Sequence, residues 1–279
     1  LDRKRIVLVA GFQGVDRLGD VTTLGRGGSD TSAVALAAAF RADLCQIYTD
    51  VDGVYTTDPR IVPNARKLDE ITYDEMLELA SQGAGVLHNR SVELAKKFRV
   101  DLEVLSSLER KPGTKVKEVT KVEKTTIAGV AKDTSIARVA LIGLQHNPGV
   151  AFQVFDLLSK HNINVDIILQ SIGREDTKDI SFTVHKKDLE DAESILNENK
   201  EALRFDHIET DSHIGKVSIV GAGLMTNCGM AARMFEALYE AGINIQMINT
   251  SEIRVSVLLD EDDIDLAVRA IHAKFFDDI

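Results

Sequence analysis

The second half of the chain contains the same sequence unit twice. Residues 148–171 (PGVAFQVFDLLSKHNINVDIILQS) recur 80 residues later as residues 228–251 (CGMAARMFEALYEAGINIQMINTS). Each copy follows an apolar run, at 139–144 or 217–221, and begins at a turn that contains a glycine. Self-similarity at a fixed spacing predicts two copies of one small domain.

The pattern inside each copy predicts its architecture. A helix with apolar residues at helical spacing, Phe155 and Leu158 in one copy, comes before a second strand. Residues 179–184 and 252–257 then alternate between apolar and polar side chains, as half-buried strands do, and a final helix follows. The order strand, helix, strand, strand, helix, with a strand to close, predicts a ferredoxin-like sandwich.

A glycine-rich stretch in the first half, residues 22–32 (TTLGRGGSDTS), leads into the alanine-rich run 33–40. Glycines allow a tight turn, and the Ser, Asp and Thr residues after them are good helix N-caps. A helix N-terminus favours an anion, Arg26 adds a guanidinium fork that fits a carboxylate or phosphate, and Asp30 offers a partner for an ammonium group. The stretch suits a zwitterionic amino acid, but its spacing alone is equally typical of an ordinary turn before a helix.

A polar segment follows the next predicted strand. Residues 44–48 are a short apolar run typical of a buried strand, and residues 49–60 (TDVDGVYTTDPR) come directly after it. Ligands of open α/β sheets bind at the carboxyl ends of strands, so this segment is a second candidate site. For each single aspartate the alternative is an Asp-Gly turn with solvated charges.

The rest of the first half alternates predicted strands and helices, which indicates an α/β sheet with helices on its faces. The sequence predicts strands at 6–10 and 102–105 and helices at 72–80 and 89–98. Residues 115–124 are rich in lysine and glutamate, and we expect an exposed linker or an edge strand there.

Composition argues against several kinds of function. A formal net charge of −11 disfavours a nucleic-acid partner, which would need a basic face. No run approaches the roughly 18 apolar residues of a membrane span, so we expect a cytoplasmic protein without membrane contact. Cys45 and Cys228 lack the paired spacing of a zinc site, and we expect two free thiols and no protein-bound metal.

The two candidate stretches, 22–30 (TTLGRGGSD) and 48–60 (YTDVDGVYTTDPR), resemble the signature stretches of the aspartate kinases within the amino acid kinase family. Residues 10–14 and 83–90 agree with that family in place and order, and the repeat resembles its paired ACT domains. The resemblance implies an α/β fold with a partial three-layer amino acid kinase sandwich followed by two ferredoxin-like (βαββαβ) ACT domains. The implied segments are the kinase part at 1–115, a linker or edge strand at 116–136, and ACT domains at 137–214 and 215–279.

The resemblance implies transfer of the γ-phosphoryl group of ATP, bound with Mg²⁺, to the β-carboxylate of L-aspartate. This reaction begins lysine, threonine and methionine synthesis, and lysine or threonine or both would inhibit it at the ACT domains. A homodimer or higher oligomer through the ACT domains is also implied. A non-catalytic, dimerising fragment that binds effectors is the alternative, and a kinase of glutamate or a derivative is disfavoured by the repeat.

The resemblance also implies the roles of individual residues. Arg26 would hold the α-carboxylate of the substrate, with Gly27, Gly28, Ser29 and Asp30 completing the aspartate site. The implied nucleotide contacts are Thr49, Asp50, Tyr55, Thr56, Asp58, Pro59, Arg60 and Gly85. The implied effector contacts are Asn164, Asp166, Gln170, Asn244, Ile245, Ser251 and Glu252.

The sequence departs from the family pattern in places. Gly85 stands where some members carry a lysine, Cys228 where the first copy has a proline, and His146 where some relatives have an aspartate at the effector turn. The lobe that carries the lysine-glycine-glycine phosphate loop is expected to be missing before residue 1. The chain by itself is therefore not expected to be catalytically competent.

Overall fold

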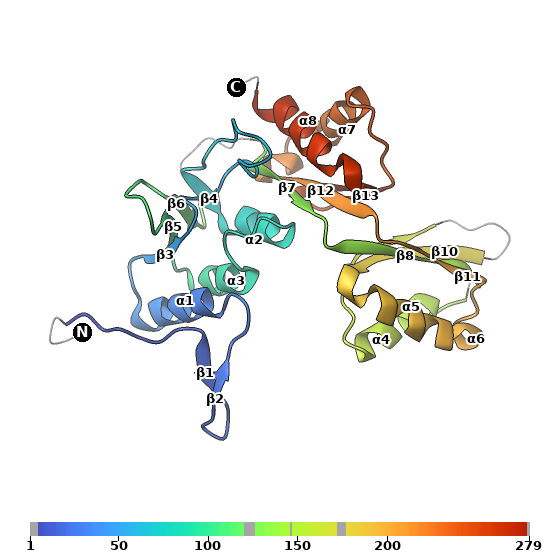
Figure 1. Cartoon of the computed structure of the whole chain (residues 1–279), viewed down its shortest axis with the longest axis horizontal. Helices are drawn as coiled ribbons and strands as arrows, with labels where there is room; N and C mark the ends of the chain where they lie inside the picture. The colour runs from blue at the N-terminus through green and yellow to red at the C-terminus, as the bar shows by residue number, and fades with distance from the viewer. Residues whose placement is uncertain (1–4, 120–125, 146, 172–176, 278–279) are drawn as a thin grey trace.

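The computed structural model describes residues 5–119, 126–145, 147–171 and 177–277. They form a kinase-like α/β domain followed by a first and a second repeat domain (Figure 1). The second repeat domain contacts both of the others, because its residues contribute to the apolar clusters on both sides. The second repeat domain thus connects the other two.

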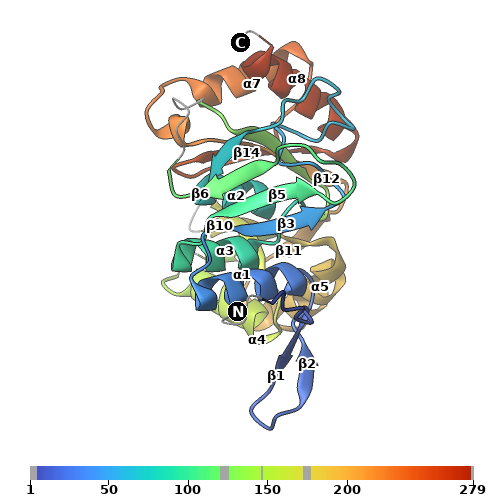
Figure 2. The same ribbon diagram turned by 90° about the vertical axis from the view of Figure 1, so that its left-hand side faces the viewer.

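The kinase-like domain is built on a sheet in the order β3 (Cys45–Thr49), β5 (Leu102–Ser106), β6 (Thr114–Lys117) and β4 (Glu70–Thr72). Strands β3 and β5 are parallel, as are β4 and β6, while β5 and β6 are antiparallel. One face packs against helices α1 (Gly28–Phe40), α2 (Tyr73–Ser81) and α3 (Asn89–Phe98) (Figure 2). On the opposite face of β3, Gln46 and Tyr48 are exposed.

The helices begin where local chemistry favours it. Thr72 accepts a hydrogen bond from the backbone of Glu75 and the Glu75 carboxylate binds back to Thr72, which is a complete capping box for α2. His88 caps α3, and the predicted helix 89–98 is confirmed at both ends. The buried faces of these helices, including Met76 and Val92, form the core of the domain.

The predicted strand at 6–10 is wrong. Residues 5–12 form no strand in the structure, and the side chains of Ile6 and Leu8 are almost fully exposed. The chain instead forms a hairpin of β1 (Gln13–Val15) and β2 (Val21–Thr23). A strand needs a neighbour for its backbone hydrogen bonds, and no described strand lies beside residues 6–10.

The first repeat domain confirms the predicted sandwich. Its antiparallel sheet has the order β11 (His207–Asp211), β8 (Ile136–Gln145), β10 (Thr177–His185) and β9 (Val165–Gln170). The helices that pack on it are α4 (Val150–Lys160), α5 (Leu189–Glu198) and α6 (Lys200–Leu203).

The second repeat domain takes its closing strand from elsewhere in the chain. Its sheet has the order β13 (Met247–Thr250), β14 (Arg254–Asp260), β12 (Ile214–Val220) and β7 (Gly129–Asp133), with α7 (Met230–Glu240) and α8 (Ile264–Phe276) on one face. Strand β7 precedes the first repeat domain, so that domain is inserted into the second. The expected linker at 116–136 therefore contains a strand of the second domain, and β6 is internal in its sheet rather than at an edge.

The face of the second repeat domain that lacks helices is shared between its two neighbours. Near α2, Ser218 donates a hydrogen bond to Gln82 at 3.1 Å and Ser256 lies 2.7 Å from Ser218. Near the first repeat domain, the buried ammonium group of Lys216 lies 2.6 Å from Asp166. Movement of the first repeat domain would therefore reach α2 across a single sheet.

Candidate active site

The two candidate stretches lie at one edge of the kinase-like sheet. Helix α1 runs back along the sheet before β3 begins, so the start of α1 and the end of β3 are on the same side. Strand β5 runs parallel to β3 with Thr49 opposite Ser106, and Ser107 donates a hydrogen bond to the Thr49 carbonyl at 2.9 Å. The start of α1 and the end of β3 thus lie on the same side of the sheet, where ligands of open α/β sheets bind.

The turn before α1 requires its glycines. Gly27 has φ 70°, and a Cβ there would lie 2.3 Å from the His88 ring. A Cβ on Gly28 would lie 2.8 Å from Leu24, while Arg90 donates a hydrogen bond to the Leu24 carbonyl at 2.9 Å. The N-terminus of α3 therefore supports the turn from behind, and among the described residues no side chain caps α1.

The side chains implied in substrate binding surround this helix N-terminus. Arg26 is exposed, and no hydrogen bond or ion pair joins it to any residue that the structure describes. Asp30 is half-buried and accepts a hydrogen bond of 3.4 Å from Ser29. A cation, a carboxylate and a helix N-terminus can together bind the α-carboxylate and ammonium groups of an amino acid.

Aspartates of the second stretch are held by their neighbours. Asp52 accepts a hydrogen bond from the Tyr55 hydroxyl at 2.9 Å and forms an ion pair with Lys67 at 3.3 Å. Although partial burial opposes the shift, the Tyr55 hydrogen bond and the Lys67 charge lower the pKa of Asp52. Asp50 is exposed and accepts a hydrogen bond only from Thr49, at 3.0 Å, among the described side chains.

Asp58 and Arg60 form a two-pronged ion pair with a shortest distance of 2.7 Å. The hydrogen bond from Arg60 holds the pKa of the Asp58 carboxyl below its usual value. Thr56 is buried between Arg66 and the second repeat domain, whereas Pro59 and Gly85 lie on the surface. A Cβ on Gly85 would touch nothing, so this position is open to solvent.

Sequence reasoning missed Lys67. Its ammonium group lies on Asp52 and also donates a hydrogen bond of 2.6 Å to the Pro112 carbonyl. A single lysine in a loop carries no pattern that would have identified it.

The implied effector residues fall into three groups. Asn164, Asp166 and Gln170 lie on or beside β9, the edge of the first repeat sheet, and Asp166 is paired with Lys216. Ser251 and Glu252 line a cavity of about 700 Å³ between α2 and the second repeat domain, whose wall also includes Glu75 and Glu118. Asn244 is exposed and Ile245 half-buried before β13, and His146 lies outside the described residues.

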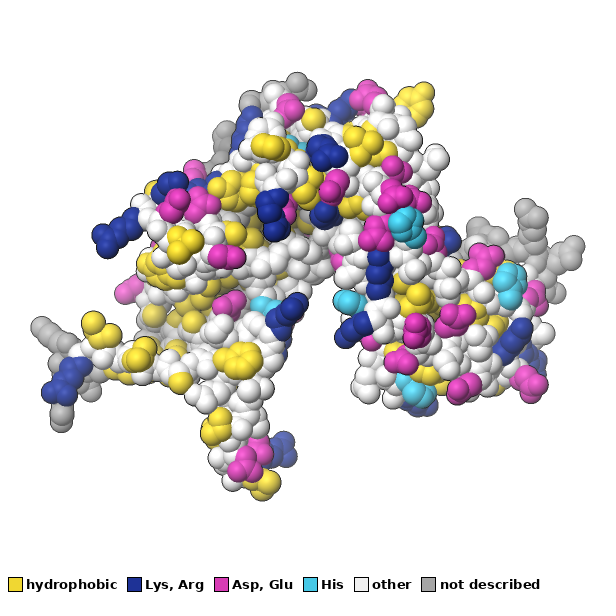
Figure 3. Space-filling model, viewed as in Figure 1, with side chains coloured by type: hydrophobic (Ala, Val, Ile, Leu, Met, Phe, Trp, Pro, Cys, Tyr) yellow, Lys and Arg dark blue, Asp and Glu magenta, His cyan; other side chains and the backbone are white. Residues whose placement is uncertain are grey.

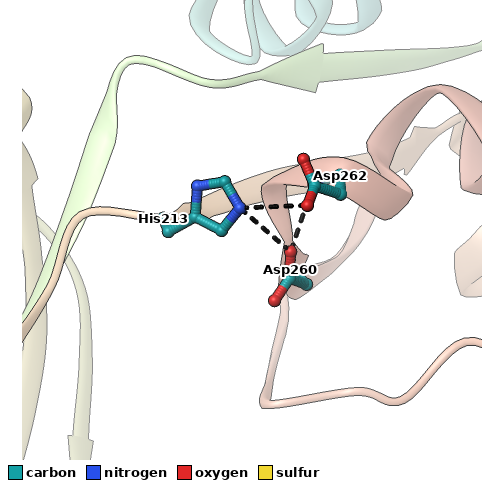
Figure 4. A group of neighbouring side chains, drawn as sticks. All are labelled: His213, Asp260 and Asp262. Atoms are coloured by element: carbon teal, nitrogen blue, oxygen red, sulfur yellow. Dashed lines mark hydrogen bonds and ion pairs between the residues drawn. The ribbon is translucent and has the colours of Figure 1, made fainter.

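One group of side chains in the described part of the chain has the spacing of metal ligands, although none was expected. His213 Nε2 lies 3.5 Å from Asp260 and 3.3 Å from Asp262, and all three side chains are exposed (Figure 4). Glu261 lies 3.6 Å from His213 Nδ1 and 2.7 Å from Lys186. This cluster joins the two repeat domains and is remote in sequence from the candidate active site.

We expect the pKa of His213 to be above the ordinary value of about 6.5, because Asp262 hydrogen-bonds its charged form and Asp260 and Glu261 add negative charge. The attraction between protonated His213 and these carboxylates stabilises the fold fully at a pH below the unfolded-state pKa of His213. This contribution disappears as the pH rises through the folded-state pKa. An NMR titration of the imidazole should show the raised value. Asp262→Asn should bring the pKa of His213 toward its ordinary value of about 6.5. Asp263→Asn is the control and should leave the pKa raised, because no hydrogen bond or ion pair joins Asp263 to His213 among the described residues.

The surface around these sites is mixed in charge. Figure 3 shows acidic and basic side chains interspersed over the repeat domains and a yellow apolar area on the kinase-like domain. No helix among the described residues is long and apolar enough to cross a bilayer.

Comparison with known proteins agrees with this architecture. Residues 1–106 match the amino acid kinase family, and residues 139–199 and 217–275 match the ACT domain. The chain is 52% identical over 277 residues to an aspartate kinase of Pseudomonas putida, covering 99% of this chain and 67% of that protein. It spans 66% of a similar aspartokinase of Pseudomonas aeruginosa, at 52% identity over 97% of this chain.

Solved structures give the same result. The chain superposes on E. coli aspartokinase III in complex with aspartate and ADP (R-state) with a TM-score of 0.80 at 31% identity. With the same enzyme in complex with lysine and aspartate (T-state), the TM-score is 0.75. These alignments cover 95% of this chain and 60% or 59% of the E. coli chain. The chain thus belongs to the aspartate kinase family and joins part of an amino acid kinase domain to two ACT domains.

Proposed function

We propose that the chain is the substrate-binding and regulatory part of an enzyme that transfers the γ-phosphoryl group of ATP to the β-carboxylate of L-aspartate. The observation that carries the proposal is the N-terminus of α1, which no described side chain caps, beside Arg26, which has no ion pair among the described residues. The polar segment that follows β3 begins on the same side of the sheet. A relative, E. coli aspartokinase III, has been solved with aspartate and ADP, which supports this assignment.

The chemistry fits these residues. A carboxyl with a pKa near 3.9 is already ionised at neutral pH, so its oxygen attacks the γ-phosphorus without a general base. The bond from that phosphorus to the bridging oxygen breaks, its electron pair leaves with ADP, and an acyl phosphate forms. The protein positions the two substrates and neutralises the negative charge of the phosphates.

Each group has a proposed role. Arg26 binds the α-carboxylate, Asp30 the ammonium group, and Ser29 completes the aspartate site. Asp50 is the carboxylate of the second stretch that forms no ion pair with a described residue, and it would hold the Mg²⁺ that accompanies ATP. Mg²⁺ supplies neutralisation of phosphate charge, and the side chains from Thr49 to Arg60 orient the nucleotide.

We further propose that lysine or threonine binds at the ACT domains and inhibits the reaction. E. coli aspartokinase III has been solved with lysine and aspartate, which supports lysine as an effector. The related strands β9 and β13 are both sheet edges and carry the half-exposed Ile168 and Ile248. Such edges pair readily, so a second copy of the chain is the proposed partner there.

The test is calorimetric titration of the chain with lysine, threonine, L-aspartate and ATP–Mg²⁺, each separately. Binding of L-aspartate and of one effector supports the proposal, and weak ATP binding is compatible with it because the chain spans two thirds of its relatives. Effector binding without aspartate binding would instead favour a purely regulatory fragment. If no amino acid binds, both functions are excluded.

Substitution of Gln170 tests the effector site. Gln170→Ala should weaken effector binding about tenfold, as expected for loss of one or two hydrogen bonds to a charged ligand. Gln153→Ala, an exposed glutamine on α4 of the same domain, is the matched control and should bind like the wild type. Equal affinity of the Gln170 and Gln153 variants would remove Gln170 from the effector site.

A further inference from the structure

The last helix of the chain is bound to the proposed nucleotide segment. The imidazole of His272 on α8 lies 2.9 Å from the hydroxyl of Thr56, across 216 residues of sequence. Arg66 donates a hydrogen bond of 2.9 Å to the Phe276 carbonyl, and Asn64 donates one of 3.0 Å to Asp277. The loop from Thr56 to Arg66 therefore packs on α8 through several polar contacts.

The tautomer of His272 decides which group donates in the hydrogen bond to Thr56. The Thr56 hydroxyl oxygen accepts from the backbone N–H of Arg66 at 3.0 Å, so the hydroxyl proton is available for His272. If it donates to Nε2, the neutral ring carries its proton on Nδ1, which is buried and has no hydrogen-bond partner among the described residues. Burial lowers the pKa of His272, which agrees with a neutral ring stacked on Phe276.

Thr56 is held from further directions through its backbone. Its N–H donates to the Arg66 carbonyl at 2.9 Å, and its own carbonyl accepts from Val130 of β7 at 2.7 Å. As whole residues, Thr56 is 3% exposed and His272 is 1% exposed. A buried hydrogen bond between two such groups fixes the rotation of a side chain, which an apolar contact of the same size would leave free.

We propose that His272 is a positioning residue for phosphoryl transfer: through Thr56, it sets the conformation of the segment that orients the nucleotide. The inference rests on the proposed function, since residues 49–60 contact ATP only under that proposal. Tyr55 is the neighbour of Thr56, and the Asp58–Arg60 pair follows within four residues. A shift of α8 within the second ACT domain would therefore reach the nucleotide without passing through the aspartate site.

Matched variants test the hydrogen bond itself in the 279-residue chain. His272→Leu fills the space with an apolar side chain but removes the hydrogen-bond partner of Thr56. His272→Gln can place an amide oxygen or nitrogen near the Nε2 position. Amide hydrogen exchange at Thr56 and Arg66 should be about fivefold faster in His272→Leu, and close to wild type in His272→Gln. Amides of β5 are the internal control and should not change.

Kinetics then test positioning in the enzyme with a complete kinase domain. His272→Leu should raise KM for ATP about fivefold, while KM for aspartate stays unchanged and kcat changes little. His272→Gln should restore the wild-type KM for ATP. Thr56→Val should raise KM for ATP to the same extent, and the double variant should be no worse than Thr56→Val alone. Thr56→Val decides the test if His272→Leu does not fold.

The outcomes separate the two proposals. A lower melting temperature with an unchanged KM for ATP would show that His272 only stabilises the fold, and would overturn its positioning role. Absence of aspartate-dependent ADP formation by the wild-type enzyme would overturn the proposed function and the kinetic role together. In that case the exchange rates would still report whether His272 holds the loop.

Discussion

Replacement of Arg26 by alanine should weaken the binding of L-aspartate about 100-fold. A guanidinium that grips a carboxylate through two charge-assisted hydrogen bonds contributes about 3 kcal/mol, and 1.4 kcal/mol is a factor of ten. Arg26 has no competing partner among the described residues, so its guanidinium group is available to the substrate. The measurement is calorimetric titration of the chain with aspartate, or KM for aspartate in an enzyme with a complete kinase domain.

Two variants bracket this result. Arg26→Lys should recover part of the affinity, because it restores the charge but not the fork geometry. Arg17→Ala removes an exposed arginine from the hairpin turn between β1 and β2 and should change nothing. Aspartate affinity that is the same in Arg26→Ala and Arg17→Ala would exclude Arg26 from the substrate site.

Gly83→Ala should destabilise the protein by about 3 kcal/mol, the sum of a strained left-handed conformation and a steric clash. Gly83 has φ 103°, and a Cβ there would lie 2.1 Å from the backbone carbonyl of Lys132 on β7. Relief of the clash would push the end of α2 away from the second ACT domain and weaken the Gln82–Ser218 hydrogen bond. For a chain of this size the expected loss in melting temperature is about 9 °C.

Gly85→Ala is the matched control in the same loop. Its φ is not in the left-handed region, a Cβ would meet no other atom within 4 Å, and the change should stay within about 0.5 kcal/mol. Thermal melting followed by circular dichroism distinguishes the two variants. Equal melting temperatures would mean that the contact between Gly83 and β7 does not form in solution.

Much of the fold could be predicted because its determinants are local. The helix at 89–98 combines a cap at His88 with apolar residues at helical spacing, and both signals lie within a dozen residues. The repeat likewise carries its strand and helix pattern inside each copy. For the site, the glycines at 25, 27 and 28 predicted a tight turn. Gly25 and Gly27 have positive φ angles, a backbone conformation that favours glycine.

The parts that sequence reasoning missed depend on distant residues. Residues 6–10 have the composition of a strand, but a strand also needs a partner, and composition says nothing about partners. Strand β7 completes a sheet whose other strands lie beyond the inserted domain. His272 and Lys67 acquire their roles only when the chain brings them to Thr56 and Asp52, so no spacing in the sequence indicates them.

The insertion of one ACT domain into the other affects the order in which the protein matures on the ribosome. Chains are synthesised from the N-terminus, so β7 emerges early but cannot pair until β12 has followed the whole first ACT domain. Once folded, that inserted domain holds its two ends together and reduces the loop-closure cost of the pairing. Helix α8 follows all of these elements, and the His272–Thr56 contact can form only after it. A chain that stops before α8 would therefore lack the anchor of the proposed nucleotide segment.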